Sequence, residues 1–126
     1  MVSADDLRRS AEHSSAPAGC WADLMLAMVA ALQPHTALLP PDGAAAFDVA
    51  ESYWRGDESR RDDLPSARFE CWAHLDAKHG SSTAISDDED RLLRALLCVL
   101  DPDVRDDEDA SLLAEWFATM INEVER

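Results

Sequence analysis

The chain is short of glycine, of basic residues and of long apolar runs, and each shortage excludes a class of protein. Its 126 residues include four glycines, so a glycine-rich loop that cradles phosphate is not expected. Eleven Lys and Arg stand against 26 Asp and Glu, and the net charge of −15 excludes a general nucleic-acid binder, which needs a basic surface. The longest apolar run, Leu24 to Leu32, is about half of a membrane span. Because the first residues also lack an apolar signal segment, we expect a cytoplasmic protein without membrane contact.

Cysteine is scarce as well, and its spacing does not suggest disulfides. Cys20, Cys71 and Cys98 are odd in number, far apart in the sequence and without a C-x-x-C pair. Each lies within an apolar helical pattern. The sequence therefore predicts buried, reduced thiols.

No motif indicates catalysis or a cofactor. The Asp101-x-Asp103 pattern begins like an EF-hand calcium loop, but Asp106 replaces the required glycine and Leu112 replaces the bidentate glutamate. Cys71 and His74 have the spacing of two zinc ligands on one helix, yet no second pair exists. We therefore predict a protein that is not an enzyme and holds no metal. A small metal-dependent enzyme remains the third hypothesis.

Apolar residues recur at helical spacing along most of the chain, and no segment alternates as a strand does. The sequence predicts an all-α single domain over residues 1–126, an irregular or orthogonal bundle of five or six helices with short loops. Whether residues 1–16 are loosely ordered is left open. The expected helices cover residues 5–13, 20–33, 43–55, 65–79, about 87–100 and about 107–124.

Capping residues and stop signals mark several helix ends. Asp42 is expected to cap the third helix, and Ser86 with Glu89 forms a capping box for the fifth. Gly56 and Gly80 are placed to stop the third and fourth helices. The side chains expected in the core include Phe69, Trp72, Leu75, Leu112, Trp116 and Phe117.

Ten carboxylates and only three bases lie between Ser86 and Ala110, at the ends of two apolar helical patterns. Acids in a first helical turn complement the helix dipole, which explains part of this cluster. The surplus is either a solubility device or a surface that attracts a basic partner. In the second case Trp54 would be an aromatic contact residue beside it. The candidate partner-binding residues are Trp54, Asp57, Glu58, Asp87, Asp88, Asp90, Asp101, Asp103, Asp106, Asp107, Glu108 and Asp109.

One segment resembles a known family. Ala50-x-x-Tyr53-Trp54-Arg55-Gly56-Asp57, followed by Leu64-x-x-Ala67-Arg68-x-x-Cys71-Trp72, is similar to helix-turn-helix stretches of small bacterial immunity proteins, which neutralise polymorphic toxins. The similar segment, residues 46–79, covers about a quarter of the chain. The resemblance implies a cytoplasmic partner-binding protein that inhibits a toxin by covering its active site.

The leading hypothesis is thus an immunity-type inhibitor whose acidic surface binds a basic toxin domain. A toxin that acts on nucleic acid or nucleotides would have the positive active site that such an inhibitor needs. The alternative is a non-catalytic helical adaptor, or a homodimeric regulatory module that shares the apolar stripe of the last helix between chains. The sequence leaves open whether the protein is a monomer or a homodimer.

Overall fold

Helices make up nearly all of the computed structural model, which describes residues 3–12, 22–80, 85, 87–101 and 107–124. Within these ranges there is no strand, and the all-α bundle predicted from the sequence is confirmed. No helix of the described chain is both long and apolar enough to cross a membrane. The elements are α1 (Ala4–Glu12), α2 (Ala22–Leu32), the 3₁₀ helix η1 (Gln33–Leu38), α3 (Pro41–Trp54), the 3₁₀ helix η2 (Glu58–Arg60), α4 (Asp63–His79), α5 (Asp88–Val99) and α6 (Asp107–Val124).

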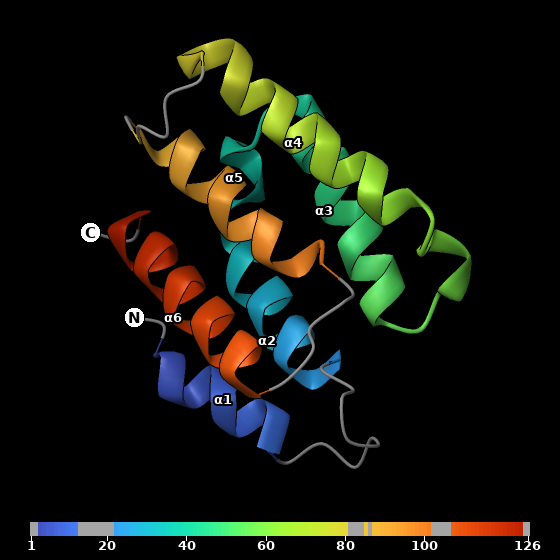
Figure 1. Cartoon of the computed structure of the whole chain (residues 1–126), viewed down its shortest axis with the longest axis vertical. Helices are drawn as coiled ribbons and strands as arrows, with labels where there is room; N and C mark the ends of the chain where they lie inside the picture. The colour runs from blue at the N-terminus through green and yellow to red at the C-terminus, as the bar shows by residue number, and fades with distance from the viewer. Residues whose placement is uncertain (1–2, 13–21, 81–84, 86, 102–106, 125–126) are drawn as a thin grey trace.

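The helix α2 runs through the middle of the bundle and contacts α1, α3, α5 and α6 (Figure 1). On the side facing the viewer, α4, α5 and α6 lie side by side with α5 between the other two. The helix α1 packs against both α2 and α6. Arg8 joins α1 to α6, since its guanidinium donates to Ser111 Oγ at 3.3 Å and pairs with Glu115 at 3.4 Å.

The core forms where the apolar stripes of these helices meet. The central helix α2 is apolar on most of its surface, as expected of a buried helix. The helix α6 buries one stripe at spacings of three and four residues, with Phe117 and Ile121 fully enclosed. This stripe is buried against other helices of the same chain. The other large, fully buried side chains are Leu24, Met25, Met28, Leu32, Leu64, Leu92, Leu93, Leu96 and Leu100.

The helix ends follow the sequence signals in part. Gly56 (φ 116°) and Gly80 (φ 65°) stop α3 and α4 in the left-handed region, as predicted. The residue that caps α5 is Asp87, whose carboxylate accepts from the backbone N–H of Asp90 at 3.0 Å; Ser86, the expected cap, lies outside the described residues. The expected cap Asp42 is also wrong, because α3 begins with the proline before it and Asp42 lies in the first turn.

Four large side chains expected in the core are exposed instead. Phe69 is 71% exposed and Trp72 is 43% exposed on α4, while Leu112 is 58% and Trp116 is 44% exposed on α6. The reason is that each outer helix buries a single narrow stripe. In α4 the buried residues are Leu64, Ala67, Cys71 and Leu75, and in α6 they are Ala110, Ala114, Phe117, Ala118, Met120 and Ile121.

Candidate functional site

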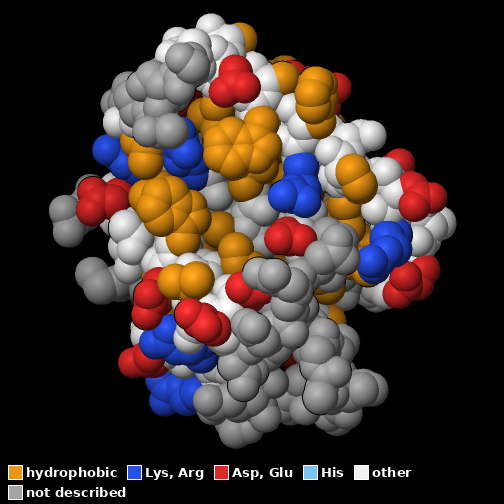
Figure 2. Space-filling model, in the orientation of Figure 1, with side chains coloured by type: hydrophobic (Ala, Val, Ile, Leu, Met, Phe, Trp, Pro, Cys, Tyr) orange, Lys and Arg blue, Asp and Glu red, His pale blue; other side chains and the backbone are white. Residues whose placement is uncertain are grey.

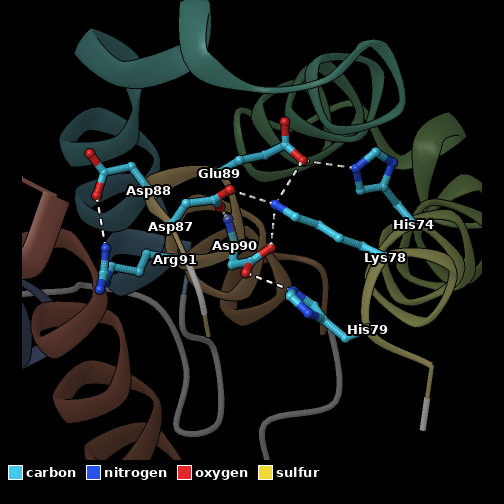
Figure 3. Close-up of polar contacts among 8 residues, drawn as sticks. All are labelled: His74, Lys78, His79, Asp87, Asp88, Glu89, Asp90 and Arg91. Atoms are coloured by element: carbon cyan, nitrogen blue, oxygen red, sulfur yellow. Dashed lines mark hydrogen bonds and ion pairs between the residues drawn. The ribbon is translucent and has the colours of Figure 1, made fainter. Parts of the chain in front are cut away.

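A cluster of charged side chains joins the end of α4 to the start of α5 (Figure 3). The Lys78 ammonium lies at its centre, with its Nζ atom 2.7 Å from Asp87 Oδ2 and 3.0 Å from Asp90 Oδ1. On either side of it, His74 Nε2 lies 3.0 Å from Glu89 Oε1, and His79 Nε2 lies 2.7 Å from Asp90 Oδ2. The Lys78 ammonium thus forms ion pairs with the carboxylates of both Asp87 and Asp90.

The electrostatics of this cluster favour its charged forms. The ammonium of Lys78 and the backbone N–H of Asp90 hold the pKa of Asp87 below its usual value. The carboxylates of Asp87 and Asp90 in turn raise the pKa of Lys78 above its usual value. Within the described ranges, no three His, Cys, Asp or Glu side chains come together as ligands of a metal ion would. The cluster therefore works as an ionic contact between two helices.

This cluster corrects one predicted partner-binding residue. Asp90 is completely buried, so its carboxylate cannot be part of a surface that meets a partner. Burial is tolerated because Lys78 and His79 approach its two oxygens from α4. Asp87 and Asp88 remain exposed, although Asp88 pairs with Arg91 at 2.9 Å.

Those predicted acidic residues that the structure describes do not gather in one patch. Asp88 and Asp101 lie at opposite ends of α5, roughly 20 Å apart along the helix axis. Glu58 is exposed in η2, beyond the end of α3. On the face in Figure 2, acidic side chains are scattered, some at the margin and some near the centre beside the apolar side chains.

The other predicted residues have different surroundings. Asp57 caps η2 by accepting from the backbone N–H of Ser59 at 3.1 Å. At the start of α6, Glu108 is exposed and Asp109 is half-buried. Asp103 and Asp106 lie outside the described residues, as does the side chain of Asp107.

Trp54 is part of the internal packing and is not a freely presented contact residue. Its indole Nε1–H donates to the backbone carbonyl of Val99 at 2.7 Å, and its ring packs edge-on against Tyr53 with centroids 4.8 Å apart. Val99 is in the last turn of α5, where carbonyls lack helical partners. Trp54 therefore ties the end of α3 to the end of α5.

A pocket of about 310 Å³ opens on the face formed by α4, α5 and α6. Figure 2 shows apolar side chains gathered near the centre of this face. Trp72 on α4 and Trp116 on α6 are both exposed and line the pocket from two sides of α5. The remaining lining residues are Arg68, Arg94, Leu97, Cys98, Asp101 and Leu113.

Two arginines give this pocket a local charge that differs from the rest of the protein. Arg94 is almost fully buried, with its Cζ atom 5.7 Å from the centre of the Trp72 ring, a cation–π geometry. Arg68 lies one helical turn before Trp72 on α4 and is half-buried. Among the described lining residues, these two arginines stand against one carboxylate, that of Asp101.

The cysteine in this pocket, Cys98, is buried. Burial raises the pKa of the Cys98 thiol to about 12, and its Sγ–H donates to the carbonyl of Arg94 at 3.7 Å. Cys71 is buried as well, and its pKa is also raised to about 12. Both thiols are free, as the sequence predicts, while Cys20 lies outside the described residues.

Sequence reasoning missed this pocket, although its spacings are in the sequence. Arg68 and Trp72 are four residues apart, and Leu113 and Trp116 are three apart, so each pair shares one helix face. Placing these pairs together requires knowing that α4 and α6 flank α5. No family model matches the chain, and no curated protein or solved structure matches it.

Proposed function

We propose that this protein is a non-catalytic binding protein that captures a basic protein partner on the face of α4, α5 and α6. The observation that carries the proposal is the exposed aromatic surface on that face, where Trp72 and Trp116 flank one pocket. Contiguous exposed apolar surface marks interaction sites, and tryptophan and arginine are enriched among the residues that dominate binding energy. Phe69 and Leu112 add exposed apolar area on the two outer helices.

The negative net charge of the protein favours a partner with a positive net charge. The bases that form ion pairs are already neutralised within the chain, among them Arg8, Lys78 and Arg91. A net charge of −15 therefore remains for solvent ions or a partner to neutralise. Acids also border the aromatic surface, since Asp76 follows Trp72 by one turn and Glu108 precedes Leu112 by one turn, both exposed. A basic partner would be steered to this face by long-range attraction.

The specific form of this proposal is an immunity-type inhibitor that acts in the cytoplasm. Its partner would be a toxin domain whose substrate is a nucleic acid or a nucleotide, because such domains hold phosphates with basic active sites. An acidic inhibitor uses the same basic surface to bind and block the toxin. The local similarity of residues 46–79 to immunity proteins supports this form.

The test is a capture experiment on lysate of the cells that produce the protein, at low and moderate salt. We compare the wild-type chain, the double variant Trp72→Ser/Trp116→Ser, and the control Leu38→Ser, which removes an exposed leucine from η1. We expect one basic protein at stoichiometric level on the wild type and the control, and its loss from the double variant. Addition of the pure chain should then inhibit the activity of the captured protein.

Two results would overturn the proposal. Equal retention of the same protein by all three chains would show that the α4–α5–α6 face is not the binding face. Retention of only scattered basic proteins, all lost at moderate salt, would show that the negative charge binds non-specifically. A stoichiometric acidic or neutral partner would instead favour the adaptor function.

A further inference from the structure

The pocket between Trp72 and Trp116 contains an arginine, Arg68, that forms no ion pair within the described chain. Arg68 forms no ion pair or hydrogen bond with any residue of the described chain, whereas Arg60 pairs with Asp63 and Arg55 with Glu51 on neighbouring surface. Carboxylates exceed bases by 15 in this protein, so a base that forms no ion pair is unexpected. Arg68 is also half-buried, which removes part of the water that would otherwise solvate its charge.

We propose that this pocket binds a small organic acid, namely a carboxylate attached to an apolar or aromatic body. The guanidinium of Arg68 presents paired N–H donors that match the two oxygens of a carboxylate. The apolar body would lie between Trp72 and Trp116, over Leu97 and Leu113. This site goes beyond the capture of a protein partner and does not depend on it.

The charges of the lining select the carboxylate. Among the described lining residues, Arg68 and Arg94 outnumber the carboxylate of Asp101 by one, and the carboxylate of a ligand would balance this excess. A cationic ligand would meet two arginines at short range. Exposed acids such as Asp76 and Glu108 border the same face, and salt weakens their repulsion of an acidic ligand, since the screening length is about 8 Å at physiological ionic strength.

The volume limits the size of the apolar body. About 310 Å³ is at the lower end of the range for small-molecule sites, which suits one or two fused rings. The lining also supplies the composition typical of such sites, with apolar and aromatic walls and few polar groups that fix orientation. The Cys98 thiol, with its raised pKa, takes part only as an apolar wall.

The test uses 2-naphthoate as the probe and 2-naphthamide as its neutral control of nearly the same shape. Binding is followed on the isolated chain by calorimetry and by the NMR signals of the tryptophan indole N–H groups, assigned with Trp72→Phe and Trp116→Phe. We expect 2-naphthoate to shift the Trp72 and Trp116 signals in a saturable way and to leave Trp54, which is bonded to Val99, unchanged. The amide should bind at least about tenfold more weakly, because it lacks the negative charge that would pair with the guanidinium of Arg68.

A matched pair of variants separates the role of Arg68 from the net charge. Arg68→Gln should weaken 2-naphthoate binding about tenfold or more and leave thermal unfolding unchanged. Arg55→Gln removes the same charge from the exposed end of α3 and should bind as the wild type does. Equal binding of acid and amide, an unaffected Arg68→Gln variant, or no saturable shift up to about 10 mM probe would overturn the proposal. None of these results would alter the outcome of the capture experiment, which contains no probe.

Discussion

The two oxygens of the buried Asp90 carboxylate face different bases of α4: Oδ2 lies 2.7 Å from His79 Nε2, and Oδ1 lies 3.0 Å from Lys78 Nζ. A carboxylate that is completely buried depends on such partners, because desolvation would otherwise disfavour its charge. The contact therefore fixes the position of α5 against the end of α4.

Replacing Asp90 should destabilise the fold more than replacing its exposed neighbour. Asp90→Asn keeps the size of the side chain and removes the charge that Lys78 and His79 face. We expect the free energy of unfolding to fall by about 2 kcal/mol, as for other hydrogen bonds to charged groups. The control Asp88→Asn breaks an exposed pair with Arg91 and should cost less than about 0.5 kcal/mol. Urea denaturation measures both, and equal losses would contradict the ionic contact described above.

The Asp87–Lys78 pair should make stability depend on pH at the acidic end. The folded pKa of Asp87 is lower than its unfolded value because Lys78 and the Asp90 N–H stabilise the carboxylate. Asp87 therefore contributes stability above its unfolded pKa of about 3.9, and this contribution is lost as the pH falls through the folded pKa. Urea unfolding between pH 6 and pH 2 should show the wild type and Asp87→Asn converging as the pH falls. A constant difference would contradict the lowered pKa.

Lys78 should produce the opposite dependence at the basic end. Its folded pKa is raised, so the stabilisation is present below the unfolded pKa of about 10.4 and is lost as the pH rises through the folded value. The variant Lys78→Met lacks this group. We expect the stability difference between wild type and variant to shrink only at strongly alkaline pH, measured by urea unfolding from pH 8 upward. A difference that vanished near neutral pH would contradict the raised pKa.

Trp54 and Trp116 should respond differently to the same substitution. Trp54→Phe removes the indole N–H and leaves the carbonyl of Val99 without its 2.7 Å donor, which should lower the free energy of unfolding by about 1–3 kcal/mol. Trp116→Phe alters an exposed ring and should change stability by less than about 0.5 kcal/mol. Thermal unfolding distinguishes the two. A larger loss for Trp116 would place that ring in the core.

The phenylalanines of α4 and α6 offer a second comparison. Phe117→Ala opens a cavity in the centre of the bundle and should cost about 3–5 kcal/mol. Phe69→Ala removes a largely exposed ring, and we expect a change within about 0.5 kcal/mol. Chemical denaturation of both variants tests the exposed position of Phe69. A large fall in the free energy of unfolding of Phe69→Ala would indicate that this ring is buried.

The sequence predicts the helices well because their signals are local. Helical spacing, Gly56 and Gly80 act within a few residues, so the all-α class and two of the helix ends are found without a structure. Which part of a helix is buried is a different question. Phe69 and Trp72 are as apolar as Leu75, but only the neighbours of α4 decide which of them is covered, and those neighbours come from distant segments.

The candidate site could be predicted only in part, for the same reason. The acidic composition is plain in the sequence, yet the burial of Asp90 depends on Lys78 and His79 lying opposite it. The aromatic pocket draws its walls from three helices, so no single stretch of sequence contains it. Counting charged residues predicts the sign of a partner's net charge. The residues that would contact the partner can be identified only from the folded structure.

The contact of α1 with α6 has a consequence for how the chain folds during synthesis. Arg8 and the residues it contacts, Ser111 and Glu115, are more than a hundred positions apart, so α1 completes its contacts only after α6 has left the ribosome. Until then the side of α1 that packs against α6 stays uncovered. The chain therefore closes its bundle late, and contacts of such long sequence separation slow folding and prolong the exposure of apolar surface to chaperones and proteases.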